Sequence, residues 1–99
     1  MSNHQRNRTV QQAATSLAPT GVLAAAKEFF ARHSGVYSAF PEKEGPVHLT
    51  LRGQGGEEIA IGVADAPGGT AVTASTYMFD QQVARFLASL PPASADASA

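Results

Sequence analysis

Hydrophobic residues recur along the chain with two different periods, and the longer period predicts two helices. Over residues 20–34 the apolar positions fall on one face of a helix at 100° per residue. That face carries Val22, Leu23, Ala26, Phe29, Phe30 and His33. We expect Thr20 to be the N-cap of this helix and Gly35 to follow its end. A second helix is predicted after the N-cap candidate Asp80, with apolar positions at Val83, Phe86, Leu87 and Leu90.

Between the two helices the period falls to two, which is typical of half-buried strands. A short strand is expected at residues 36–40, followed by a charged turn, PEKEGP. Three more strands follow, separated by the glycine-rich turns GQGG and DAPGG. The positions predicted to face the helices are Val47, Leu49, Leu51, Ile59, Ile61, Val63, Val72, Ala74 and Met78.

This order predicts an α+β fold: a helix, a four-stranded antiparallel meander and a helix, with both helices on one face of the sheet. Residues 20–90 are expected to form this single domain. Residues 1–19 are expected to be a polar, partly disordered tail, which could form a short amphipathic helix from about residue 8 until Pro19 ends it. Residues 91–99, PPASADASA, are expected to be a disordered tail.

The face of the sheet opposite the helices is unusually poor in long charged side chains. Its candidate interface residues are Thr50, Ala60, Gly62, Thr73, Ser75 and Tyr77. Small residues allow a second surface to approach closely, so a second copy could pack here and form a homodimer. Tyr77 has the amphipathic ring that suits an interface anchor. The alternative interpretation, an ordinary solvated sheet face, stays open.

Composition narrows the classes of function. The 99 residues are 43% hydrophobic and 15% charged with a net charge of −1, enough for one core and too little positive charge to predict nucleic-acid binding. The chain has no cysteine, which excludes disulfides, thiolate metal sites and a cysteine nucleophile. No apolar run approaches the roughly 20 residues of a membrane span. We therefore expect a cytoplasmic protein that binds itself, another protein or a small apolar ligand.

Candidate catalytic chemistry is sparse. The three histidines are scattered without metal-ligand spacing, and neither glycine-rich loop leads into a helix as a phosphate cradle requires. His33 is expected to cap the end of the first helix, and His48 to lie across from Glu58 on the outer face. The sequence assigns no catalytic, cofactor-binding or metal residue. An enzyme acting through His33 or His48 is kept as a second alternative.

The segment GGTAVTASTYMFDQQVARFLASL, residues 68–90, resembles the end of helix-grip domains of the START and polyketide-cyclase type. Similar strand-then-helix endings occur in small TATA-binding-like α+β modules. The chain is too short for the full set of helix-grip strands, so a complete grip would need two copies. The resemblance implies a small apolar-ligand cavity between sheet and helices, lined by Phe29, Phe30, Met78 and Phe86. The same residues could instead fill the core.

Two main functions therefore follow from the sequence. The first is a small non-enzymatic interaction or assembly module that forms a homodimer through the outer face of its sheet. The alternative is a binder of a small apolar ligand in the helix–sheet core.

Overall fold

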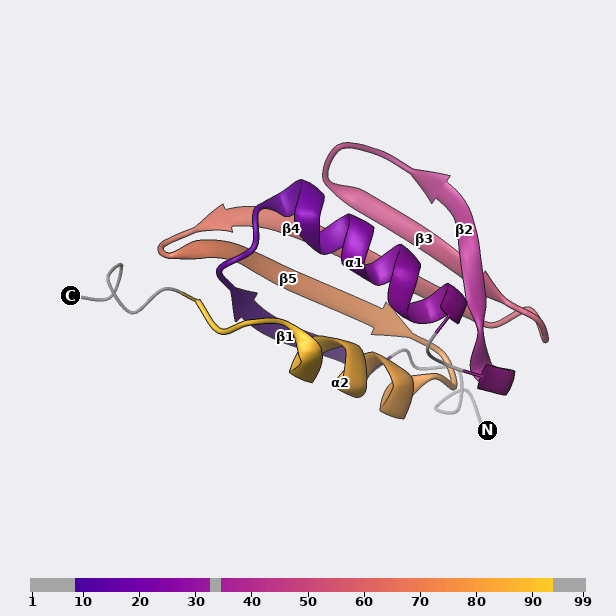
Figure 1. Cartoon of the computed structure of the whole chain (residues 1–99). Helices are drawn as coiled ribbons and strands as arrows, with labels where there is room; N and C mark the ends of the chain where they lie inside the picture. Colours follow the sequence, from indigo (N-terminus) through magenta and orange to yellow (C-terminus); the bar gives the residue numbers. More distant parts are fainter. Residues whose placement is uncertain (1–8, 33–34, 94–99) are drawn as a thin grey trace, which may run out of the picture.

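The computed structural model describes residues 9–32 and 35–93, and these form one antiparallel sheet with both helices against one face (Figure 1). The strand order across the sheet is β1-β5-β4-β3-β2. The elements are β1 (Thr9–Thr15), α1 (Pro19–Arg32), the 3-10 turn η2 (Gly35–Tyr37), β2 (Ala39–Glu44), β3 (His48–Gly53), β4 (Glu58–Ala66), β5 (Gly69–Thr76) and α2 (Asp80–Ser89). The predicted α+β class and the placement of the helices are confirmed.

The sheet has five strands rather than four, because residues 9–15 form β1 and not the expected helix. The whole of β1 pairs with β5, from Thr9 opposite Thr76 to Thr15 opposite Thr70. Pairing with a neighbouring strand overrides the weak helical spacing of this segment. The sheet therefore begins at Thr9, within the predicted N-terminal tail. Pro19 is the first residue of α1 and does not end an earlier helix. Thr20, the predicted N-cap, therefore lies inside α1.

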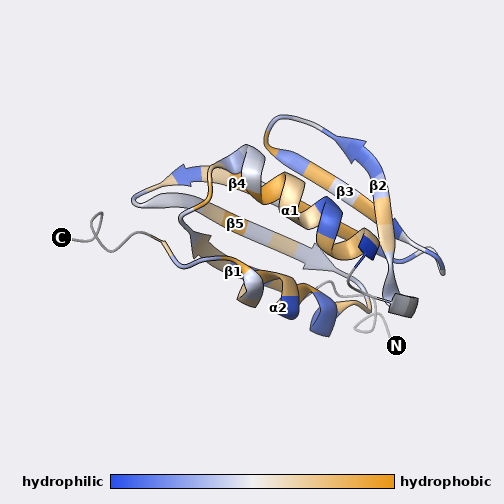
Figure 2. Cartoon of the chain, in the orientation of Figure 1, coloured by the Kyte–Doolittle hydropathy of each residue, from blue (hydrophilic) through white to orange (hydrophobic). Residues whose placement is uncertain are grey.

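Three further boundaries differ from the predictions. The expected charged turn at residues 41–44 belongs to β2, which appears blue at this end in Figure 2. Val47 precedes β3 and is 55% exposed, so the helices do not cover it. Asp80 is the first residue of α2 rather than its N-cap, a position taken by Phe79. Alternation of residue types could not locate these element ends.

The β5–α2 connection also reverses one predicted orientation. Met78 was expected to face the helices, but it is 80% exposed and has a positive φ of 77°. This left-handed residue turns the chain so that Phe79, only 5% exposed, points into the core instead. Phe79 packs edge-on against Tyr37, with ring centroids 5.7 Å apart.

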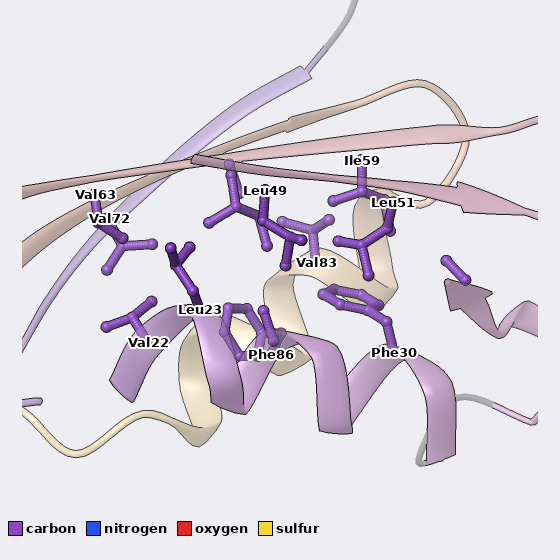
Figure 3. Packing of buried hydrophobic residues seen from close by; sticks show 14 of the residues in the cluster. Val22, Leu23, Phe30, Leu49, Leu51, Ile59, Val63, Val72, Val83 and Phe86 are labelled. Carbon is purple, nitrogen blue, oxygen red and sulfur yellow. The ribbon is translucent and has the colours of Figure 1, made fainter. Parts of the chain in front are cut away.

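The core lies between the sheet and the two helices (Figure 3). Ile59 and Ile61 are buried, as the period-two pattern predicts, and Phe30 and Phe86 are fully enclosed. Buried hydroxyls close the ends of the core: Thr70 Oγ1 donates to the Leu17 carbonyl at 2.6 Å, and Thr76 Oγ1 donates to the Glu58 carbonyl at 2.8 Å. These bonds satisfy polar groups that would otherwise be costly to bury.

Gly69, at the β4–β5 turn, lies against the connection between β1 and α1. Its φ is +148°, and a Cβ built there would fall 1.9 Å from the Thr15 carbonyl oxygen. Only glycine allows the hairpin and the end of β1 to approach this closely.

Candidate interaction surface

The outer face of the sheet, opposite the helices, carries alternate residues of every strand. Cross-strand pairing places Thr50 opposite Ala60 and Ala60 opposite Ser75. The next row places Gly62 opposite Thr73. The structure thus brings five of the six predicted interface residues together on three adjacent strands, β3, β4 and β5. The centre of this face is built from small, uncharged side chains.

Gly62 is the flattest point of the outer face. A Cβ built on Gly62 has no other atom within 4 Å, so a side chain there would project into open space. A glycine in the middle of a strand weakens that strand by about 0.5–1 kcal/mol relative to alanine, with no contact in the monomer that requires it. Because Gly62 has no side chain, the surface is depressed at this point, and another molecule could approach the strand closely.

An ion-pair network marks one end of the outer face. Arg52 Nη2 lies 2.7 Å from Glu42 Oε1 and 3.6 Å from Glu58 Oε2, joining β2, β3 and β4. Arg52 Nη1 also donates to the Gly56 carbonyl at 3.1 Å. The hydrogen bond to Glu42 raises the pKa of Arg52, because it stabilises the charged guanidinium. These charges are paired within the chain and lie beside, not across, the small-residue centre.

Large apolar side chains border the same face, and sequence reasoning found only one of them. Tyr77, predicted there, is 37% exposed, while Val10 on β1 and Phe40 on β2 are 60% and 49% exposed. Val10 lies opposite Ser75, and Phe40 lies opposite Arg52. Both were missed because residues 9–15 were predicted to belong to a partly disordered tail that could form a short helix, and because the register of β2 was undefined. Val10 and Phe40 alternate with inward-facing residues of their strands. Once the two strands are assigned correctly, this alternation places both side chains on the outer face.

A shallow hollow lies where β1 meets β5. It is lined by Gln12, Ala13, Ala14, Ala71, Val72 and Thr73. Two further hollows flank Met78, one against Tyr37 and α2 and the other against Arg52 and Tyr77. The small-residue surface therefore continues from the centre of the sheet to its β1 edge.

The predicted apolar-pocket residues do not all meet. Phe29, Phe30 and Phe86 form one aromatic cluster, with ring centroids 5.2–5.6 Å apart. Phe30 and Phe86 are 0% and 1% exposed. Met78 lies on the surface at the end of β5, away from this cluster. The three rings pack against one another as a core does.

The histidine predictions have separate outcomes. His48 lies opposite Gly62, and Arg52 takes the expected place across from Glu58. The His48 ring instead lies against Gly45, where a Cβ would meet the imidazole. His33 lies outside the described residues. Within residues 9–32 and 35–93, His, Asp and Glu side chains form no group of three that could hold a metal.

The comparisons with known proteins bear on the fold. No family model matches the chain, and no curated protein matches its sequence. Among solved structures, an AHSA1-like protein from Aeromonas hydrophila superposes with a TM-score of 0.57 over 83% of this chain and 87% of that chain, at 14% identity. No helix in the described part of the chain is long and apolar enough to cross a membrane. At this identity the likeness concerns the fold alone, and it agrees with the helix-grip resemblance of residues 68–90.

Proposed function

We propose that this domain is a small, non-enzymatic interaction module that forms a homodimer through the outer face of its sheet. The supporting observation is the composition of the centre of that face, where Thr50, Ala60, Gly62, Thr73 and Ser75 lie on adjacent strands. Solvated sheet faces normally carry long charged side chains that discourage association. Here such side chains lie toward the β2 side of the sheet, in the Arg52 network and at Lys43 opposite Thr50.

The chemistry of the face favours a second sheet as the occupant. Facing sheets pack about 10 Å apart when their side chains interdigitate, and small residues permit an approach at least this close. Tyr77 and Val10 border the small-residue centre and supply apolar area that a partner would cover. The Arg52 network already satisfies its own charges, so association does not require a charged partner.

A charge at Gly62 tests this proposal without disturbing the monomer, because a side chain there has open space. We expect the wild-type chain to sediment as a dimer at micromolar concentration and Gly62→Glu to weaken the dimer by at least about tenfold. Gln54→Glu, in the exposed β3–β4 turn, makes the same charge change away from the face. A wild-type monomer at that concentration, or equal dimerisation by wild type and Gly62→Glu, would refute the proposal.

Binding of a small apolar ligand in the core is the second candidate. It is favoured by the fold shared with the AHSA1-like protein and by the cluster of Phe29, Phe30 and Phe86 between the helices and the sheet. Native mass spectrometry of the protein purified from cells tests it. A co-purified apolar molecule that Phe29→Trp displaces supports this function, and a spectrum of the chain alone contradicts it. The cytoplasmic location stays a prediction.

A further inference from the structure

The two edges of the sheet are built differently. The β2 edge carries Pro41, three charged residues at 42–44, and a register shift between Pro41 and Lys43. Prolines, charges and bulges are the devices by which proteins prevent edge strands from pairing with other chains. The β1 edge, TVQQAAT, has seven residues and contains no proline and no charged side chain. Among the residues that the structure describes, one edge is therefore protected against strand pairing and the other is open to it before Thr15.

The backbone of β1 has hydrogen-bonding groups on its free side. Beyond the end of β1, the Ser16 N–H bonds the Pro91 carbonyl at 3.4 Å, and Thr15 forms a bridge with Pro92 on the side away from β5. Alternate residues of a strand direct their N–H groups to the same side. Val10, Gln12 and Ala14 therefore point their N–H groups away from β5.

We propose that the free edge of β1 pairs antiparallel with β1 of a second copy, centred on Gln11. This inference rests on the self-association in the proposed function, but it uses backbone atoms of the edge and not the outer face. In this register, Gln12 lies opposite Val10 of the second copy, and Thr9 lies opposite Ala13. The two sheets then form one continuous sheet with twofold symmetry.

The edge itself indicates a second copy as the partner. The bridge between Thr15 and Pro92 occupies the last position of the edge, so an incoming strand must fit the stretch before it. The register centred on Gln11 does this, because it makes Thr9 to Ala13 pair with themselves in reverse and leaves the backbone of Ala14 and Thr15 to the bridge. Every pair in this register is uncharged, so no like charges oppose one another. Val10, 60% exposed in one copy, would gain the neighbouring Gln12 side chain.

Amide hydrogen exchange distinguishes edge pairing from face packing. The Gln11 N–H points toward β5 and is expected to exchange slowly at any protein concentration, which makes it an internal control. The Gln12 N–H is expected to exchange slowly in the dimer and rapidly on dilution to monomer. Face-to-face packing leaves the edge amides unpaired. Rapid exchange at Val10 and Gln12 in a sample that sediments as a dimer would overturn the edge proposal while leaving outer-face association intact.

Substitutions at Gln12 provide the second test. Gln12→Pro removes the N–H on the free side, where an edge strand tolerates proline, and Gln12→Lys places like charges in diagonal positions across the twofold axis. We expect each to weaken association by at least about tenfold, with Gln54→Lys as the matched control. If Gln12→Pro fails to fold, Gln12→Lys decides. If Gly62→Glu loses association and Gln12→Lys keeps it, edge pairing is refuted. If Gln12→Lys loses association and Gly62→Glu keeps it, the outer-face dimer is refuted. A monomeric wild type refutes both.

Discussion

The Thr15 hydroxyl donates a 2.6 Å hydrogen bond to the Pro91 carbonyl, joining the end of the first strand to the chain that leaves the last helix. The segment at residues 91–92 was expected to be the start of a disordered tail. Instead, Pro91 and Pro92 both contact the end of β1. The two ends of the described fold are thus held together by a side chain that is itself completely buried.

Replacing Thr15 with valine tests the energetic importance of this link. The Thr15 Oγ1 atom also accepts a hydrogen bond from the Leu17 N–H at 3.3 Å, so Thr15→Val removes two interactions without changing the side-chain shape. We expect the free energy of unfolding to fall by about 1–2 kcal/mol, measured by urea denaturation. The control, Thr20→Val, lies on the exposed surface of α1 and should change stability by less than about 0.5 kcal/mol. Equal effects of the two substitutions would contradict this account.

Gly69 is predicted to be intolerant of any side chain. Gly69→Ala should lower the free energy of unfolding by at least about 2 kcal/mol, because it combines an unfavourable φ with a collision against the Thr15 backbone. Gly21→Ala is the matched control. Gly21 lies in α1 and its Cβ would lie 3.7 Å from the Cβ of Leu17, an ordinary contact, so the substitution should stabilise the helix by about 0.5–1 kcal/mol. Thermal unfolding of the two variants should shift in opposite directions, and a shared direction would disprove the assignment.

Replacing Met78 with glycine is expected to stabilise the fold. The positive φ of 77° is costly for a side chain with a Cβ, and the side chain is 80% exposed and contributes little packing. We expect Met78→Gly to raise the free energy of unfolding by about 0.5–1 kcal/mol in chemical denaturation. Met78→Leu keeps the strain and should leave stability unchanged. Destabilisation by glycine would mean that the Met78 side chain makes contacts that outweigh the strain.

Phe30 and Phe29 are sequence neighbours with different expected roles. Phe30 is fully buried, so Phe30→Ala should cost about 3–5 kcal/mol of folding free energy through lost burial and a residual cavity. Phe29 is only partly buried against the core, so Phe29→Ala should cost clearly less. Equilibrium denaturation of both variants measures the difference. Equal losses would show that the aromatic cluster is evenly enclosed, which favours a continuous core over a ligand site.

The sequence predicted the parts of the fold in which local pattern and tertiary packing agree. Ile59 and Ile61 face the helices as their alternation requires, and Val83 and Phe86 form the buried face of α2. The pattern failed for residues 9–15, since a strand at the sheet edge is fixed by pairing with β5, 55 to 67 residues later in the chain. No local signal carries that information.

The sequence also predicted only part of the candidate surface. Thr50, Ala60 and Gly62 could be placed on the outer face from alternation alone, because they lie within regular strands. The orientation of Met78 could not be predicted in this way. It depends on a left-handed backbone conformation, which a methionine in the sequence does not indicate. Val10 became part of the surface only once β1 was known to be a strand. Residues at strand ends and turns therefore required the structure.

The pairing of β1 with β5 has a consequence for synthesis on the ribosome. The first strand leaves the exit tunnel early, whereas its partner emerges only after β2, β3 and β4 have been translated. During that interval the uncharged strand β1 has no partner strand at either edge. Identical strands emerge at the same time from neighbouring ribosomes on the same messenger RNA. Chaperone demand should therefore be greatest in this interval, and it should fall when β1 is moved to follow α2 in a circularly permuted gene.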